Sequence, residues 1–174
     1  WNGEDVRVLK KWTPIEEMPE YLIKAAISSE DQKFVENSGF NWEAIQKAFK
    51  HNLKHKNIIG GSTISQQTAK NVFLYPRRSY IRKALEAYFT VLIEWIWGKE
   101  RILEVYLNVA EMGKGIYGAE AAAQELFGKK ASELTRHEAS LITACLPNPL
   151  ERHADKPSQY VSKRAGQIRS LIPK

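Results

Sequence analysis

Apolar side chains recur at helical spacing along almost the whole chain. Between residues 41 and 55 they recur every three or four positions, which places them on one face of a helix. These residues are Trp42, Ile45, Phe49 and Leu53. Lysines and histidines fill the opposite face, so this helix is expected to be amphipathic and basic. The alternation typical of strands is weak everywhere, and the sequence therefore predicts a mainly α fold.

Capping residues indicate where the helices begin and end. Asn41, Thr63 and Ser79 are typical N-caps, and Gln66 completes a capping box with Thr63. Gly128 is a typical helix end. We expect helices at about 19–30, 79–97, 100–110, 119–127, 136–146 and 158–172, and two more that begin near 41 and 63. They are expected to form one compact unit, 1–174, with a looser basic lobe at about 44–80.

The positive charge is concentrated in one quarter of the sequence. The 174 residues include 26 Lys and Arg and 20 Asp and Glu. Between Ala44 and Leu85 there are nine basic residues and no acid, so the remainder holds 17 basic and 20 acidic residues. This pattern fits a local anionic partner, such as nucleic acid, an anionic membrane surface or a phosphorylated substrate, but also a plain solvated face.

Composition narrows the classes of protein further. Hydrophobic residues make up 43% of the chain, which is typical of a globular domain. The longest apolar run, 84–97, contains Glu86 and Glu94 and is shorter than the ~20 residues that span a bilayer. Cys145 lies in an apolar helical pattern and is expected to fill the core. The abrupt start at Trp1 is what we expect of a fragment without its targeting or anchoring segment.

The stretch "GGSTISQQTAK" (60–70) combines several features of an anion site. Two glycines and two hydroxyls precede a helix start, where N–H groups and the helix dipole favour an anion. Lys70 follows two turns later, and Arg77, Arg78 and Arg82 come soon after. No Walker sequence is present. A phosphate or pyrophosphate site and an ordinary glycine turn both remain open at this point.

Two acids are candidates for chemistry. Glu30 follows an apolar helix and adjoins Asp31, so neighbouring charge and partial burial favour a general base, although a solvated helix end is the alternative. Glu86 stands one helical turn after Arg82, as a surface ion pair or as a carboxylate beside an anion site. His51 and His55 lie among lysines without other ligands, so no metal site is expected there.

Five ordered stretches resemble glycosyltransferase family 51, the peptidoglycan glycosyltransferases. They are "EDQKF", "GGSTISQQTAKN", "RSYIRKALEAY", "KERILEVYLN" and "GIYGAEAAAQELFGK", and the likeness covers roughly residues 12–150. Without Ser-x-x-Lys or a transpeptidase domain, the chain resembles the monofunctional biosynthetic type, without its membrane anchor. The resemblance implies a lysozyme-like helical domain with a small membrane-associated jaw lobe, which includes the donor site, at about 44–80.

The resemblance also implies a reaction. Such enzymes polymerise lipid II into β-1,4-linked glycan strands with inversion and release undecaprenyl pyrophosphate. Glu30 matches the family's general base and Glu86 its second catalytic carboxylate, which orients nearby cations or a divalent ion. The positions that match substrate-binding residues are Asp31, Phe34, Gly60, Ser62, Thr63, Gln66, Gln67, Lys70, Asn71, Arg78 and Arg82.

The family context sets further expectations. The catalytic domain is expected on the outer, periplasmic face of the bacterial cytoplasmic membrane, in contact with anionic lipid and with cell-wall synthesis or division proteins, and without nucleic acid. Moenomycin-type phosphoglycolipids are expected to bind. No cofactor is required by the sequence, although Mg²⁺ or Mn²⁺ assists many members. Where the family commonly has His-x-Gly-x-Asp, this chain has Asn37, Gly39 and Asn41, which puts any acid, base or charged-contact role at position 37 in question.

Two other functions compete with this interpretation. A lysozyme-like muramidase or lytic transglycosylase shares a catalytic Glu and a helical fold, but it needs no acid-free cationic stretch. A non-enzymatic module that binds anionic membranes or nucleic acid explains the basic stretch, but not "EDQKF" or "KERILEVYLN".

Overall fold

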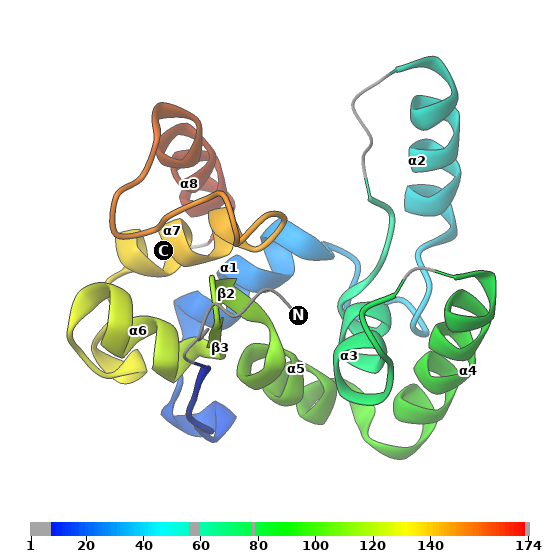
Figure 1. Cartoon of the computed structure of the whole chain (residues 1–174), viewed down its shortest axis with the longest axis horizontal. Helices are drawn as coiled ribbons and strands as arrows, with labels where there is room; N and C mark the ends of the chain where they lie inside the picture. Colours follow the sequence, from blue (N-terminus) through cyan, green and yellow to red (C-terminus); the bar gives the residue numbers. More distant parts are fainter. Residues whose placement is uncertain (1–7, 56–59, 78, 173–174) are drawn as a thin grey trace. The chain divides into compact units, whose positions relative to one another are not determined.

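The computed structural model describes residues 8–55, 60–77 and 79–172, and these residues form a mainly α fold (Figure 1). The fold class predicted from the sequence is thereby confirmed. The α-helices of the described residues are α1 (Glu20–Glu30), α2 (Trp42–Lys54), α3 (Ile64–Phe73), α4 (Tyr80–Ile96), α5 (Gly98–Val109), α6 (Ala119–Phe127), α7 (Arg136–Cys145) and α8 (Gln159–Leu171). Two 3-10 helices, η1 (Ile15–Glu17) and η2 (Ala131–Glu133), lie between them.

Contacts between residues divide the chain into two units. Unit 1 consists of Trp1–Ser29 and Leu107–Lys174, and unit 2 is the continuous stretch Glu30–Tyr106. The division falls at the last residue of α1 and within α5. All residues predicted from the sequence to catalyse or bind substrate belong to unit 2. A separate lobe at 44–80 stays a prediction.

The helix starts follow the capping chemistry that the sequence predicts. The side chains of Asn41, Thr63 and Ser79 each accept a hydrogen bond from a backbone N–H in the first turn of the helix that follows. Gly128 ends α6 in the left-handed conformation, with a φ of 67°. One difference concerns the start of α5, which lies at Gly98, with a φ of 72°, and not at about residue 100.

The small sheet of unit 1 was not expected from the sequence. Its strands are β1 (Leu9–Lys10), β2 (Glu111–Gly113) and β3 (Ile116–Tyr117), in the order β1-β3-β2. β1 runs parallel to β3, and β2 runs antiparallel to it. Strands of two or three residues are too short to show a periodic alternation, so their sequence carries no recognisable signal.

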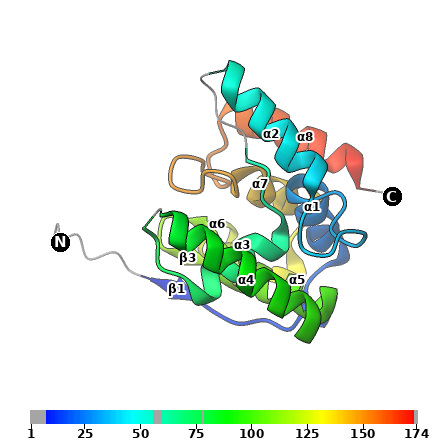
Figure 2. The ribbon, with the colours of Figure 1, turned by 90° about the vertical axis from the view of Figure 1, so that its right-hand side faces the viewer.

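Unit 1 is held together by helices and by a long-range polar contact. α7 and α8 lie side by side in both ribbon views (Figures 1 and 2). The Asn108 side chain accepts a hydrogen bond from the backbone N–H of Thr13 (2.8 Å) and donates one to its carbonyl (2.9 Å). Cys145 is fully buried in α7, and burial raises the pKa of its thiol to about 11. It therefore fills the core, as predicted.

In unit 2, α3 packs along α4 (Figures 1 and 2). Ile64 and Ala69 of α3 and Ile93 of α4 are buried. Gly61, just before α3, passes so close to α2 that a Cβ there would lie 2.9 Å from the Ala44 carbonyl oxygen. Within the described ranges, no helix has the length and apolar character needed to cross a membrane.

Candidate functional site

Glu30, the predicted base, lies at the end of α1 and contacts α3. Its Oε2 accepts a hydrogen bond from the Nε2 of Gln67 (3.1 Å). Burial, and secondly the negative charge of Glu30, hold the pKa of the Tyr106 hydroxyl well above its usual value. Glu30 is partly exposed, whereas Tyr106 is almost fully buried. The structure thus places Glu30 beside another residue predicted to lie in the site, Gln67.

Asp31, the neighbouring acid, has a different environment. Its side chain is buried, and both of its carboxylate oxygens accept hydrogen bonds from the Asn37 amide (3.1 Å each). Its Oδ2 also accepts the backbone N–H of Ile64, the first residue of α3 (3.3 Å). Burial raises the pKa of Asp31, and the hydrogen bonds from Asn37 and Ile64 oppose that rise. Its oxygens face only donors, and this arrangement favours a carboxylate at the start of α3, where the helix dipole also favours negative charge.

The polar groups at the N-terminus of α3 are largely used by the protein itself. Besides the bond from Ile64 to Asp31, the Gln66 N–H donates to Thr63 Oγ1 (3.2 Å), and the Thr63 N–H donates to Gln66 Oε1 (3.0 Å). Thr63 and Gln66 are both buried. Asp31 thus takes the place at this helix start where the sequence suggested that an anion could bind. Binding of a phosphate in this region would therefore depend on the cationic side chains.

The other residues predicted to bind substrate differ in exposure. Gly60, Ser62 and Asn71 are exposed, and Gln67 and Lys70 of α3 are partly exposed. Phe34 is buried, with the ammonium of Lys99 4.6 Å from its ring centroid. Arg78 lies outside the described residues. The exposed and partly exposed positions therefore lie on α3 and in the segment before it, whereas Phe34 is a buried neighbour of Lys99.

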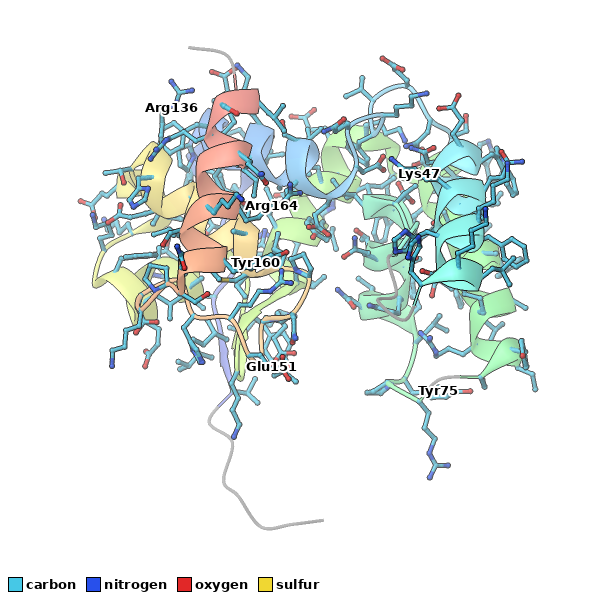
Figure 3. All side chains as sticks on the ribbon, turned by 90° about the horizontal axis from the view of Figure 1, so that it is seen from above. Lys47, Tyr75, Arg136, Glu151, Tyr160 and Arg164 are labelled. Carbon is cyan, nitrogen blue, oxygen red and sulfur yellow. The ribbon has the colours of Figure 1, made fainter. Side chains whose placement is uncertain are left out.

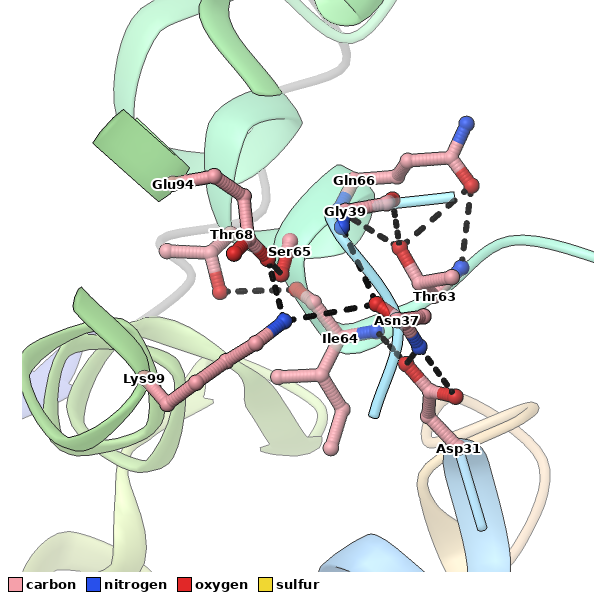
Figure 4. Close-up of polar contacts among 10 residues, drawn as sticks. All are labelled: Asp31, Asn37, Gly39, Thr63, Ile64, Ser65, Gln66, Thr68, Glu94 and Lys99. Carbon is pink, nitrogen blue, oxygen red and sulfur yellow. Dashed lines mark hydrogen bonds and ion pairs between the residues drawn. The ribbon is translucent and has the colours of Figure 1, made fainter. Parts of the chain in front are cut away.

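Sequence reasoning missed a partly buried polar network next to these residues, which Figure 4 shows. The Lys99 ammonium donates to Glu94 Oε1 (2.7 Å) and to Asn37 Oδ1 (3.3 Å). The Ser65 hydroxyl donates to the same Glu94 oxygen. A sequence signal for Lys99 does exist, because a lysine in the first turn of a helix opposes the helix dipole and needs a partner.

Glu86 is surrounded by cations from its own helix. Its side chain is 4% exposed, Lys83 Nζ lies 2.5 Å from Oε1, and Arg82 Nη1 lies 3.7 Å from Oε2. The Nε of Arg82 is buried and has no hydrogen-bond partner among the described residues. The carboxylate therefore neutralises and orients these two cations, and the exposed surface pair considered from the sequence is excluded by burial.

These residues do not fit a protein-built site for Mg²⁺ or Mn²⁺. Both Glu86 oxygens already face cations, and Asp31 is engaged by amide and N–H donors. No group of three or more His, Cys, Asp or Glu side chains that could hold a metal occurs within the described stretches. The His51 and His55 rings stack on each other with centroids 4.4 Å apart.

Comparison with known proteins assigns this helical domain to a class. A family model described as transglycosylase matches residues 4–171, and the chain belongs to this family. A biosynthetic peptidoglycan transglycosylase of Bdellovibrio bacteriovorus is 53% identical over 172 residues, which cover 99% of this chain and 69% of the relative. Its counterpart in Caulobacter vibrioides is 54% identical over 158 residues, which cover 91% of this chain and 69% of the relative.

Proposed function

We propose that this chain is a peptidoglycan glycosyltransferase that polymerises lipid II into glycan strands. Membership of the transglycosylase family and the names of the relatives support this activity. The observation that carries the proposal is the hydrogen bond between Glu30 and Gln67, which orients a partly exposed carboxylate beside the polar positions of α3. A base in a defined orientation is what activation of a sugar hydroxyl requires.

In the proposed reaction, Glu30 takes the proton from the 4-hydroxyl of the acceptor lipid II. The oxygen attacks the anomeric carbon of the lipid-linked glycan donor from the face opposite the pyrophosphate. The new C–O bond forms as the bond to the pyrophosphate oxygen breaks, so the configuration inverts to a β-1,4 linkage. Undecaprenyl pyrophosphate departs with the electron pair.

The negative charge that develops on the leaving group needs cations in fixed positions. Lys70 of α3 and Arg82 of α4 are proposed to supply them within unit 2, whereas Arg78, also predicted to bind substrate, lies outside the described residues. Glu86 holds Arg82 and Lys83 in place through its ion pairs, so these cations need little reorganisation when charge develops. Glu86 therefore acts through its neighbours and does not touch the reacting atoms.

We also propose that α2 contacts the anionic membrane that carries the substrate. Trp42, Phe49 and Leu53 of α2 are exposed by 73%, 65% and 71% of their surface. Exposed lysines lie on the same helix, and Figure 3 labels Lys47 among them. Exposed apolar side chains together with lysines are typical of a helix that lies in a lipid interface. We therefore propose that the enzyme works in the cell envelope, on the outer face of the cytoplasmic membrane, with cell-wall synthesis or division proteins as its partners.

The proposal is tested by incubating the purified chain with labelled lipid II in detergent and resolving glycan strands on a gel. We expect strands from the parent and at least ~100-fold slower synthesis from Glu30→Gln, because the variant lacks the base. Glu36→Gln, a change at an exposed position nearby, is the matched control and is expected to keep full activity. Normal synthesis by Glu30→Gln would show that another group is the base. Cleavage of finished strands without use of lipid II would support a muramidase.

A further inference from the structure

The ammonium group of Lys99 is the centre of the polar network in unit 2. It contacts Glu94 on α4, Asn37 in the segment between α1 and α2, and the face of the Phe34 ring. The Lys99 and Glu94 side chains are only 26% and 12% exposed. A partly buried ion pair with an additional hydrogen bond has a better defined geometry than an exposed pair. Lys99 therefore defines the position of Asn37 relative to α4 and α5.

Asn37 connects this cation to an anion. Its Oδ1 accepts from Lys99 and from the backbone N–H of Gly39 (3.0 Å), and its Nδ2 donates to Asp31. Only one orientation of the amide satisfies all of these partners, because the oxygen must face donors and the nitrogen must face the carboxylate. The amide is neutral and does not titrate, so Asn37 itself adds no pH dependence to the connection from Lys99 to Asp31.

The same segment is held against α3 and α4 at Gly39. This glycine has a φ of 88°, and a Cβ on it would lie 2.8 Å from Thr90 Cγ2 and 2.9 Å from Glu94 Cγ. Its carbonyl accepts the Thr63 hydroxyl (2.7 Å). Asp31 contacts α3 at Ile64, so the segment is attached to the start of α3 at two points. Movement of Asn37 would therefore be transmitted to both Asp31 and the start of α3.

We propose that Lys99 and Asn37 are positioning residues for Glu30. Asp31 directly follows Glu30, and the helix whose start Asp31 binds carries Gln67, the hydrogen-bond donor to Glu30. The chain of contacts from Lys99 through Asn37 and Asp31 to α3 thus sets the geometry of the Glu30–Gln67 pair. This inference rests on the proposed function, because it assigns the network to the orientation of the catalytic base.

The test measures lipid II polymerisation by the purified chain with Lys99→Met, Lys99→Arg and Asn37→Leu. Lys99→Met keeps the stem length and removes the charge, and we expect a 10- to 100-fold lower kcat with an unchanged KM, since misorientation of a base slows the chemical step. Lys99→Arg restores the charge and the donors and is expected to recover most of the lost kcat. In the Asn37→Leu background, Lys99→Met is expected to have little further effect, because the connection is already broken.

Lys33→Met is the matched control, because Lys33 makes an exposed ion pair with Glu43 (2.6 Å) and should keep its kcat. Binding of a labelled moenomycin-type phosphoglycolipid and circular dichroism report the folded fraction of each variant, and both are expected to match the parent. The inference is overturned if Lys99→Met polymerises lipid II like Lys33→Met, or if the activity lost in Lys99→Met is explained by KM or by the folded fraction alone. It is also overturned if Lys99→Arg is as slow as Lys99→Met, or if the effects of the Lys99 and Asn37 changes on kcat multiply in the double variant. A parent chain that makes no glycan would instead overturn the proposed function.

Discussion

Glu86 stands one helical turn beyond Arg82 on α4, with its Oε2 3.7 Å from the Nη1 of Arg82 and its other oxygen bonded to Lys83. This carboxylate is the first acid after a stretch of more than 40 residues that holds only basic charges. Because its side chain is buried, it cannot serve merely to balance surface charge. The arrangement instead orients two cations that would otherwise repel each other.

Replacement of Glu86 by Gln should therefore reduce both turnover and stability. A neutral amide leaves Arg82 without its buried counter-charge, and we expect the free energy of unfolding to fall by ~1–3 kcal/mol, since the Lys83 partner is about half exposed. Turnover is expected to fall by at least about tenfold, because the cations lose their fixed positions. Chemical unfolding and lipid II polymerisation measure the two effects.

Glu104→Gln provides the control for that change. Glu104 also pairs with an arginine three residues away on its helix, but that Arg101 side chain is 51% exposed. We expect its free energy of unfolding to change by less than ~1 kcal/mol and its turnover to stay the same. If the two glutamine variants behave alike, burial of Glu86 has no functional consequence.

Lys70 should matter for turnover far more than a lysine elsewhere in the chain. Lys70 lies in the last turn of α3, near the polar positions that line the proposed donor site. We expect Lys70→Ala to slow polymerisation in detergent by ~100-fold, because a cation at the leaving group stabilises the transition state. Lys163→Ala, at an exposed position of α8 in unit 1, should leave the rate unchanged. Equal effects of both changes would mean that only net charge contributes.

The apolar face of α2 should determine binding to membranes. Asp in place of both Phe49 and Leu53 removes exposed apolar surface and adds negative charge, and each buried side chain contributes ~1.5–3 kcal/mol to insertion. We expect at least about tenfold weaker co-sedimentation with anionic vesicles and an unchanged rate in detergent. Leu150→Asp, at a site in unit 1 that is 57% exposed, should bind vesicles like the parent. Full binding by the Phe49/Leu53 variant would exclude α2 as the contact.

The stability of unit 1 should depend on pH through Glu120. Burial alone would raise the pKa of Glu120, but hydrogen bonds from the Ala131 N–H and Lys11 outweigh it and lower the pKa from 4.5. When folding lowers the pKa of an acid, that acid stabilises the fold at pH values above its pKa in the unfolded chain. The contribution is lost as the pH falls through its pKa in the folded chain. Glu120→Gln should thus lower the free energy of unfolding by ~1–3 kcal/mol at pH 7, and the difference from the parent should narrow below about pH 4.5.

Chemical unfolding at several pH values measures this difference for Glu120→Gln, and Glu125→Gln, at an exposed position on α6, is the control. A constant difference across pH would contradict the assignment.

The helices could be predicted from the sequence because their signals are local. Thr63 accepts from the N–H of Gln66, three residues on, and α3 begins directly after it, as its capping box indicated. The three strands could not be predicted, since β1 pairs with a partner more than 100 residues away and neither segment has a periodic pattern. The boundaries of the two units also have no sequence signal, because they depend on contacts between distant segments.

The members of the candidate site stay predictions from motifs, and their arrangement could not be predicted from the sequence. Motifs identified Glu30 and Gln67, but only the structure shows that their side chains form a hydrogen bond. Thr63 and Gln66 hold the start of α3 through their polar groups, and their role as substrate contacts stays a prediction. The position of Lys99 in the first turn of a helix is a sequence signal, but its partner Glu94 lies on another helix and no spacing rule in a single sequence identifies it.

The hydrogen bonds between Thr13 and Asn108 join residues that are 95 positions apart, and β1 depends on a strand that is still further along the chain. During translation, all of unit 2 is therefore synthesised before the N-terminal segment meets the partners that complete its fold. The contacts of unit 2 lie within one continuous stretch and can form first. Completion of unit 1 is thus expected to be the last event of folding, so a ribosome that stalls before residue 107 leaves β1 and Thr13 without their native partners.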